Sequence, residues 1–506
     1  MDIKNFTIKS FHEGLMKKDF SAMEAAREFF DLIDEEDGEI HAYLRKTKDL
    51  AFSRAEEVDA LVASGEDPGI LAGVPIALKD NMLIKGEIVT AASEILSKYR
   101  ASYDATVVKS LKEARVTILG QTNMDEFAMG SSTENSAFGQ TKNPHDFERV
   151  PGGSSGGSAG AVASGMAVAA LGSDTGGSIR QPAAFCGVVG LKPTYGAVSR
   201  FGLIAMASSL DQIGPFTKTV EDSAILFNTI AGRDEFDATS VAKNYDDILN
   251  KEVSKTKELK IGLPKEYFVD GLSDEVRRGV DEAIQKFKKL GFKIKEISLS
   301  HTKYALSVYY IIMPAEVSTN LARFDGIRYS RISRINADDT RTNAEDGQYK
   351  SVSDRRRSAL EEIYFRQRGV GFGREARRRI LLGTFVLSAG YYDAYYAKAQ
   401  KVRRLIKEDF EKAFDPSADG VDLILTPVTP TTAFKFGEKT GDPLQMYLSD
   451  IFTIPANMAG IPALSIPVKK YKVGGGELPV GFQLMGRPFC ERDILSVGRM
   501  YEQDAD

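Results

Sequence analysis

The chain is predicted to fold as an α/β protein in which one large, mixed β-sheet is covered by helices on both faces. Three features carry this prediction. Short apolar runs of strand length alternate with helical segments along most of the chain. A block rich in glycine, serine and alanine runs from Pro151 to Ala183 and contains turns of the kind that join strands to helices. The length of 506 residues suffices for one very large domain or two to three ordinary ones.

The composition is that of a globular protein. Hydrophobic residues make up 42% of the chain and charged residues 27%. The N-terminus lacks an apolar core of signal-peptide length, and no apolar run is long enough to span a bilayer. The two cysteines, Cys186 and Cys490, cannot form a disulfide framework, which favours a reducing compartment. We therefore expect a cytoplasmic protein without membrane contact.

Charge and histidine content argue against two further classes of site. The net charge of −5 disfavours this chain as the main phosphate-binding surface of a nucleic-acid protein. None of the four histidines belongs to a spaced ligand motif, so no metal site is expected.

Residues 1–60 are predicted to form a helical cap packed on the same domain. Ser21 can cap a helix over 22–33, and the acidic patch 34–37 followed by Gly38 is expected to end it. Residues 61–506 are predicted to form a single domain. Its expected strands are 74–78, 115–120, 167–173, 259–263, 292–295, 421–425, 463–468 and 480–484. Its expected helices are 104–114, 158–164, 221–231, 273–290, 392–414, 443–459 and 491–501, together with one entered through Ile179, and 211–220 is expected to be a connecting segment.

An arginine-rich excursion is predicted at about 328–371. Acidic residues are interspersed among its arginines, and its apolar residues show no strong periodicity. It is either a solvated surface segment or a contact for RNA phosphate or for a partner subunit.

Two serine-bearing glycine turns lie in the glycine-rich block, at 152–157 and 174–178. Glycine clusters let backbone N–H groups converge on one point, and a serine beside them suits acyl transfer. The block contains neither a Walker A loop, GxGxxG nor GxSxG. His145 is the nearest histidine in the sequence, and we do not expect it to be the catalytic base.

Serine with lysine therefore remains as the catalytic pair. Lysine acts as a base only when neutral, which requires burial to lower its pKa by about 3 units from about 10.4. Lys79 directly follows the apolar run 74–78 and ends a predicted buried strand. Its side chain either points to solvent or is held over a cleft at the carboxyl edge of the sheet.

The block and the residues after it resemble the signature of the amidase signature family. The matching positions downstream are Gly187, Gly190, Leu191, Lys192, Pro193 and Tyr195. The resemblance implies the amidase signature fold and a Ser–cis-Ser–Lys triad. In that triad Ser178 is the nucleophile, Ser154 is the bridging serine after a cis peptide, and Lys79 is the base. The backbone N–H groups of Thr175, Gly176, Gly177 and Ser178 would form the oxyanion hole, whereas Cys186 is expected to be a buried structural residue.

Within that family the chain is similar to the glutamine-hydrolysing subunits of tRNA-dependent amidotransferases. Segments 123–130, 185–187, 200–204, 378–384 and 442–450 carry this similarity. It implies that Arg379 holds the α-carboxylate of glutamine and Asp450 its α-ammonium, with Tyr309 lining the pocket; an arginine fork suits a carboxylate. Arg378 is an alternative to Arg379.

The same resemblance implies a heterotrimer. This chain would supply ammonia to a B subunit, which would use ATP and magnesium to amidate Glu-tRNA(Gln) or Asp-tRNA(Asn), and a small C subunit would wrap both. No cofactor is expected in this chain. The alternatives are a stand-alone amidase and a non-catalytic scaffold subunit.

Overall fold

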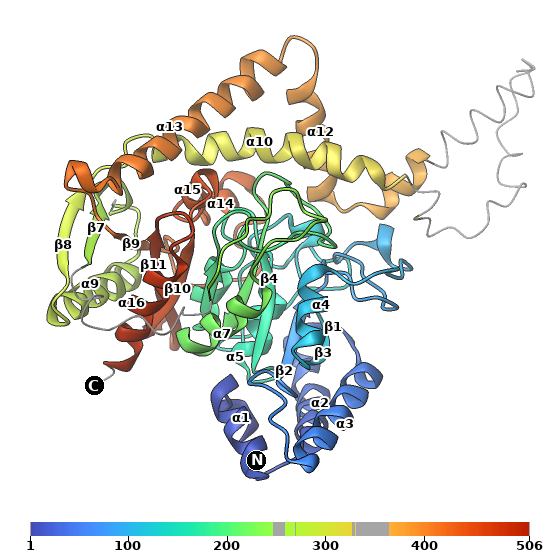
Figure 1. The fold of residues 1–506 in the computed structure, drawn as a ribbon. Coiled ribbons are helices and arrows are strands. Elements are labelled where there is room, and N and C mark those ends of the chain that lie inside the picture. The colour runs from blue at the N-terminus through green and yellow to red at the C-terminus, as the bar shows by residue number, and fades with distance from the viewer. Residues whose placement is uncertain (1, 246–258, 269, 326–328, 330–363, 505–506) are drawn as a thin grey trace, which may run out of the picture.

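The computed structural model describes residues 2–245, 259–268, 270–325, 329 and 364–504 (Figure 1). Most of the predicted arginine-rich excursion, namely 328 and 330–363, lies outside the described residues.

Within the described residues one mixed sheet of eleven strands forms the framework, in the order β1-β3-β2-β4-β6-β5-β10-β11-β9-β7-β8. Its strands are β1 (Tyr43–Lys46), β2 (Pro75–Lys79), β3 (Thr117–Thr122), β4 (Ala169–Asp174), β5 (Val189–Lys192), β6 (Gln212–Thr217), β7 (Lys260–Pro264), β8 (Lys293–Ile297), β9 (Leu423–Pro427), β10 (Ala463–Val473) and β11 (Gly476–Gly486). β2 runs parallel to both β3 and β4, whereas the central strands from β4 to β9 pair antiparallel. The carboxyl ends of β2 and β4 therefore meet at one edge.

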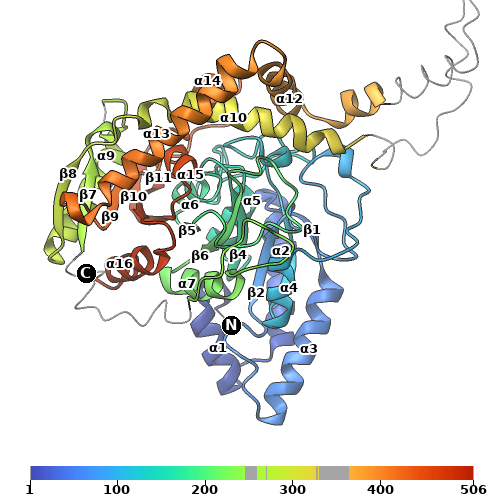
Figure 2. The ribbon, with the colours of Figure 1, turned by 45° about the horizontal axis from the view of Figure 1, so that its top comes forward.

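The helices with their bounds are α1 (Ile8–Lys17), α2 (Ala22–Ile40), α3 (Lys48–Ser64), α4 (Thr106–Glu113), α5 (Gly156–Ala163), α6 (Arg180–Cys186), α7 (Val220–Ile230), α9 (Asp274–Lys289), α10 (Ala305–Asn320), α12 (Arg374–Leu387), α13 (Lys398–Ala413), α14 (Pro443–Leu448), α15 (Ile454–Ala459) and α16 (Glu491–Gln503), with a π-helix η7 (Tyr392–Ala397) before α13. α1–α3 gather at one end of the molecule, and α10, α12 and α13 cross the opposite end (Figures 1 and 2).

Alternation along β11 shows that helices cover both faces of the sheet. The ring of Phe482 packs on Phe287 of α9 and Tyr501 of α16, with centroids 5.7 and 4.8 Å apart. A Cβ at the neighbouring Gly481 would lie 3.2 Å from Ala184 of α6. Because consecutive residues of a strand face opposite sides, α9 and α16 cover one face and α6 the other. The predicted fold class is confirmed.

Most of the predicted elements are present. Ser21 caps α2 in a capping box with Glu24, and Ser273 caps α9. The predicted strand 74–78 is β2, and the predicted strand 167–173 is β4.

The N-terminal prediction is wrong in two places. Residues 1–60 are not wholly helical, because β1 (Tyr43–Lys46) pairs antiparallel with β3 and so belongs to the central sheet. The acidic patch does not end α2, which continues to a buried Ile40. Asp37 accepts backbone hydrogen bonds from Ala42 and Tyr43 and thereby fixes the exit of the helix. The division of the chain at residue 60 stays a prediction.

Two later predictions are also wrong. The segment 211–220 contains β6, a central strand between β4 and β5, despite its glycine and proline. A Cβ at Gly214 would lie 2.0 Å from the carbonyl oxygen of Leu191, so glycine here permits close approach of β5. The predicted helix 443–459 is two helices, α14 and α15, separated by the turn that contains Asp450.

None of the described helices has the length and apolar character needed to cross a bilayer.

Candidate active site

Lys79 lies at the carboxyl end of β2 and is completely buried. The parallel register of β2 with β4 sets it beside the end of β4, where Ser173 and Asp174 lie. Its Nζ is within hydrogen-bond distance of the following oxygens: Ser154 Oγ (2.8 Å), Ser155 Oγ (2.8 Å), Ser173 Oγ (3.0 Å) and Ser173 O (3.3 Å). Of the two orientations left open by the sequence, the structure therefore has the lysine held in the interior.

The surroundings of Lys79 favour its neutral form. Burial lowers its pKa from 10.5 to about 7, although three nearby aspartates act in the opposite direction. An ammonium has three N–H donors and no lone pair, whereas the neutral amine can also accept a hydroxyl proton. Near neutral pH this amine can therefore take a proton from Ser154 Oγ, 2.8 Å away.

Ser154 follows a cis peptide bond with Gly153, as the family resemblance implied. The Gly153 N–H donates to Gln181 Oε1 at 2.9 Å, and the Ser154 carbonyl accepts from the Asp125 N–H at 3.2 Å. A Cβ at Gly153 would lie 2.2 Å from an Asp125 carboxylate oxygen, so this position has no room for a side chain.

Ser178 lies in the turn between β4 and α6, and Asp174 holds that turn in shape. The Asp174 carboxylate accepts from the N–H groups of Gly177 (2.9 Å) and Ile179 (3.1 Å). Burial acts to raise its pKa, but the buried Arg180 guanidinium, 3.1 Å away, lowers it to about 2. The Ser155 N–H donates to the Ser178 carbonyl at 3.2 Å and ties the two serine-bearing turns together.

The hydroxyl of Ser178 has no hydrogen-bond partner among the described residues, and its side chain retains slight exposure to solvent. Within the described part of the chain, the N–H groups of Thr175, Gly176 and Ser178 likewise have no acceptor. The Gly177 N–H differs from the expectation, because it is directed at Asp174. An oxyanion beside Ser178 can therefore be bound by the other three amides of the turn.

The residues expected to bind substrate lie around the same turn. A Cβ at Gly176 would lie 2.9 Å from the ring and hydroxyl of Tyr309, which α10 supplies. Thr453 Oγ1 donates to the Gly176 carbonyl at 2.7 Å and to the Asp450 carbonyl at 3.0 Å. Tyr309 and Asp450 are thus both positioned against the turn that carries Ser178.

Arg379 is anchored by Glu375, one helical turn before it on α12. Its Nε donates to Glu375 Oε1 at 2.7 Å, and its guanidinium lies 5.5 Å from the centre of the Tyr310 ring. Its side chain is 4% exposed, against 33% for Arg378, whose Nη2 donates to Tyr447 Oη at 2.6 Å. The positive charge of Arg379 acts to lower the pKa values of Tyr309 and Asp450, which agrees with the predicted site around these residues.

Asp450 has one carboxylate oxygen available. Oδ2 accepts a hydrogen bond from Ser131 Oγ, whereas the buried Oδ1 has no partner among the described residues. Burial raises the pKa of Asp450 to about 7. A buried, unpartnered carboxylate oxygen is costly unless a ligand cation pairs with it, and a substrate ammonium meets that requirement.

A pocket with a volume of about 160 Å³ opens between α12, α14 and the loop 130–135. It is lined by Gly130, Ser132, Glu134, Asn135, Arg374, Glu375, Arg378, Arg379, Lys439, Thr440, Pro443, Met446 and Tyr447. Both arginines considered as carboxylate ligands therefore lie on one small polar pocket.

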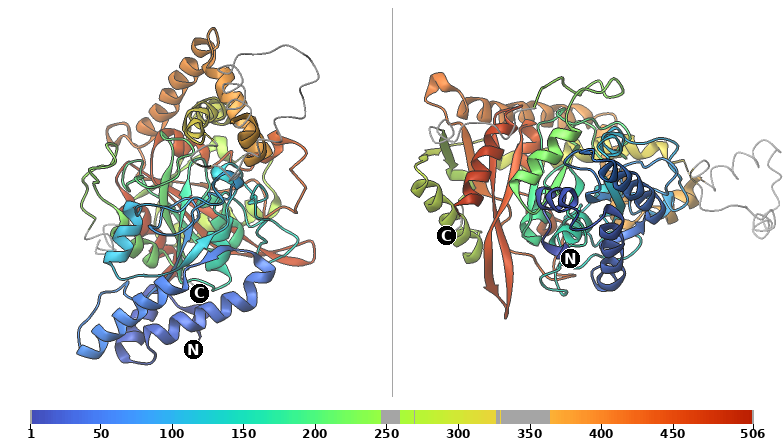
Figure 3. Two further views of the ribbon diagram at one scale, coloured as in Figure 1. Left: turned by 90° about the vertical axis from the view of Figure 1, so that its right-hand side faces the viewer. Right: turned by 60° about the horizontal axis from the view of Figure 1, so that its bottom comes forward.

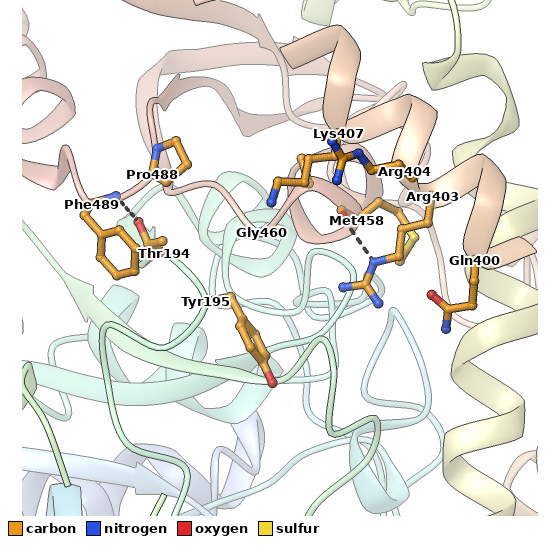
Figure 4. A pocket seen from close by; sticks show the side chains of 11 residues that line it. Thr194, Tyr195, Gln400, Arg403, Arg404, Lys407, Met458, Gly460, Pro488 and Phe489 are labelled. Carbon is orange, nitrogen blue, oxygen red and sulfur yellow. Dashed lines mark hydrogen bonds between the residues drawn. The ribbon is translucent and has the colours of Figure 1, made fainter. Parts of the chain in front are cut away.

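Another pocket, of about 430 Å³, lies beside α13 and contains none of the predicted site residues (Figure 4). Its Arg403 donates to the carbonyls of Met458 and Ser209 and to the Ser209 hydroxyl, so this arginine fastens two loops to α13.

The rival groups considered from sequence have other contacts. His145 Nε2 hydrogen-bonds the Cys186 carbonyl at 2.9 Å, and burial lowers its pKa. Cys186 is buried, its Sγ donates to the Pro151 carbonyl, and burial raises its pKa far above the ordinary value. Among the described residues no three histidine, cysteine or acidic side chains cluster as metal ligands.

Sequence reasoning missed Ser155 and Ser173 as ligands of the Lys79 amine, and Glu375 as the anchor of Arg379. Ser155 and Ser173 lie in or beside the serine-bearing turns, so their place in the motif was a usable signal. The spacing Glu375–Arg379 is an i, i+4 pair on a helix, which is a further usable signal once the helix is predicted.

Hydrolysis of amides at this site is expected to slow at acidic pH. The lysine must be neutral to accept a proton, so its titration alone should lower kcat/KM about tenfold per pH unit below pH 7 and leave it level above that pH. In the role that the family resemblance implies, ionised Asp450 would bind the substrate cation, so its titration near pH 7 should steepen the wild-type fall to about a hundredfold per pH unit. Profiles measured for wild type and Asp450→Asn separate the two groups. A profile of the variant that is flat through neutrality would exclude Lys79 as the titrating base.

A mixed α/β fold with a buried lysine–serine cluster at the carboxyl edge of two parallel strands is the architecture of an amide hydrolase that uses lysine in place of histidine. The comparisons with known proteins agree: the family model described as Amidase matches residues 24–495. The chain belongs to the amidase family.

Three of the similar proteins cover nearly the whole chain. The A subunit of glutamyl-tRNA(Gln) amidotransferase from Carboxydothermus hydrogenoformans is 55% identical over 506 residues, covering 100% of this chain and 98% of the relative. The crystal structure of the A subunit of glutamyl-tRNA(Gln) amidotransferase from Thermotoga maritima has a TM-score of 0.77 at 41% identity, covering 100% of this chain and 96% of the other. The peptide amidase from Stenotrophomonas maltophilia has a TM-score of 0.78 at 26% identity, covering 99% and 96%.

Proposed function

We propose that this chain is the glutamine-hydrolysing subunit of a tRNA-dependent amidotransferase, and that it supplies ammonia for the amidation of Glu-tRNA(Gln) or Asp-tRNA(Asn). The names of the full-length relatives support the class of complex. One observation carries the substrate. Asp450, which has a buried oxygen without a partner among the described residues, is held against the turn that carries Ser178. The buried Arg379 packs on α10, the helix that brings Tyr309 to the same turn. These charges match the carboxylate and ammonium of an amino acid.

In the proposed mechanism, Ser178 Oγ attacks the carboxamide carbon of glutamine. Its proton passes to Ser154, whose own proton passes to the Lys79 amine. The oxyanion is bound by the free amides of the turn at 175–178. The C–N bond then breaks as Lys79 returns the proton through Ser154 to the leaving nitrogen, which departs as ammonia. Water, activated by the same relay, attacks the acyl-serine and releases glutamate.

The preorganised parts of this site are its backbone and its charges. Asp174 and Arg180 fix the nucleophile turn before substrate arrives, so little reorganisation is needed in the transition state. The companion subunit would bind ATP and magnesium and the aminoacyl-tRNA, and this chain would need no cofactor of its own. A third, small subunit would complete the heterotrimer.

The direct test is ammonia release from glutamine by the purified chain, alone and coexpressed with the companion subunits of the same genome. The proposal predicts glutamine-specific release that depends on Ser178 and increases with the companions. Release from many simple amides without companions would instead indicate a stand-alone amidase. No release under either condition, with intact binding to the companions, would indicate a scaffold subunit.

Asp450→Asn is expected to weaken recognition of the substrate ammonium. Its kcat/KM for glutamine should fall about 100-fold, since a buried charged pair contributes about 3 kcal/mol. For glutaramate, the analogue without the amino group, kcat/KM should fall little in the variant, because Asp450 has no substrate cation to bind. Comparing both substrates in wild type and variant gives the discrimination directly. An equal loss on both substrates would assign Asp450 a structural role.

A further inference from the structure

α12 and the π-helix that follows it expose an unusual number of large apolar side chains. The α12 patch is defined as Leu381, Leu382, Phe385, Tyr391, Tyr392 and Tyr395, and each of these is at least 41% exposed. The patch lies on the hairpin of α12, η7 and α13, which projects from the body of the molecule (Figure 1 and the left view of Figure 3). A gathered apolar patch of this kind marks an interaction surface.

The opposite side of α12 is buried against the rest of the protein. Ala376, Arg379, Gly383 and Val386 form its buried stripe. A Cβ at Gly383 would lie 1.8 Å from the Pro314 carbonyl oxygen, so α12 and α10 are in backbone contact there. The second half of α12 thus carries apolar side chains on two sides. The hydrophobic core of this chain covers one of these sides and leaves the other exposed. A helix with this pattern is normally covered on both sides.

The aromatic side chains of the patch are already held by contacts with one another before any partner binds. The rings of Phe385 and Tyr391 have centroids 4.2 Å apart, and Tyr391 stacks on Tyr395 at 6.0 Å. Aromatic side chains held in this way give a large contact area with little loss of conformational entropy on binding.

The patch continues the wall of the small polar pocket that contains Arg379. Arg374, Glu375 and Arg378 of α12 line that pocket. Leu381, Leu382 and Phe385 each follow one of these by seven residues, which is two helical turns and about 10.5 Å along the same face. α14, the other helical wall, likewise exposes Leu444 and Leu448. Exposed apolar side chains therefore lie on both helices that frame the pocket.

We propose that the α12 patch is the docking surface for the companion protein subunit that consumes the ammonia. This inference rests on the proposed function. Ammonia released into neutral water is largely protonated and loses its nucleophilicity, so its consumer must bind this chain near the substrate site. The proposed function assigns Arg379, which lines the polar pocket, to that site. The exposed Arg374 and Arg377 at the start of α12 fit a partner face with acidic residues around an apolar centre.

The test uses the full chain and the purified companion subunits from the same genome. In Leu381→Asp/Phe385→Asp, affinity for the companions should fall about 100-fold or more, because buried charge replaces central apolar contacts. The isolated variant should keep the glutamine hydrolysis of the isolated wild type, since neither residue lines the pocket. Phe147→Asp is the matched control, because Phe147 is 46% exposed and Phe385 47%. Leu381→Ser/Phe385→Ser serves if the charged variant does not fold.

Unchanged affinity for the companions would overturn the docking surface. It would equally be overturned if the variant lost only self-association, or only binding to phosphatidylcholine–phosphatidylserine vesicles. Binding through the patch without any glutamine hydrolysis would refute the proposed glutaminase while the docking surface stands. Glutamine hydrolysis by a wild type that does not bind the companions would refute the docking surface alone.

Discussion

Ser178→Ala is expected to reduce glutamine hydrolysis by at least about 10⁴-fold in kcat, because the variant has no hydroxyl to form the acyl-enzyme. The loss should appear mainly in kcat, since the substitution removes only the Ser178 hydroxyl, which has no hydrogen-bond partner among the described residues, and keeps the backbone bond from the Ser155 N–H. Steady-state ammonia release over a range of glutamine concentrations gives kcat and KM separately.

Ser158→Ala is the control for this variant. Ser158 lies in the same glycine-rich block and is also buried, but its hydroxyl donates to the Leu171 carbonyl at 3.0 Å. It should retain activity near that of wild type. Comparable losses in both variants would mean that the block matters for folding rather than for a nucleophile at 178.

Lys79→Met is expected to reduce kcat by about 10³-fold, because it removes the amine that accepts the serine proton. Methionine keeps much of the volume and avoids a buried charge, so the fold should persist. The remaining kcat, measured at saturating glutamine where the bound substrate cation keeps Asp450 ionised, should lose its rise with pH through neutrality, which in the wild type follows the Lys79 pKa of about 7.

Lys192→Met provides a close control. Lys192 is also buried, and burial lowers its pKa to about 7 as well, but its Nζ donates to the Pro193 carbonyl at 2.7 Å. Thermal unfolding measured for both variants separates stability from catalysis. A pH–rate profile that survives in Lys79→Met and disappears in Lys192→Met would reverse the assignment.

Local signals predicted much of this fold. The caps at Ser21 and Ser273 act within one helical turn, and the glycine turns are defined by their own residues. The strands β1 and β6 were missed because long-range pairing decides them: β1 has four residues and no alternation to detect, and Gly214 is explained only by β5 beside it. α2 continues beyond its acidic patch because the tertiary contacts of Asp37 and Ile40 outweigh the low helix propensity of the patch.

In the candidate site, too, the sequence predicted the residues of the local motif but not the contacts that depend on the folded chain. The motif pointed to Lys79, Ser154 and Ser178, and the structure brings Lys79 and Ser154 into hydrogen-bond contact. The motif did not reveal that the Gly177 N–H is directed at Asp174, because that contact depends on how the turn is folded. The burial of Arg379 and the partial exposure of Arg378 depend on which side of α12 faces α10, which no sequence spacing states.

The most direct test of the account is to identify the residue that attacks glutamine. The chain would be incubated with an analogue in which a diazoketone replaces the carboxamide, and the adduct located by peptide mass spectrometry. The account predicts one adduct, on Ser178, which excess glutamine prevents and which Ser178→Ala lacks. An adduct on Cys186 or Cys490, or one that persists in Ser178→Ala, would contradict it.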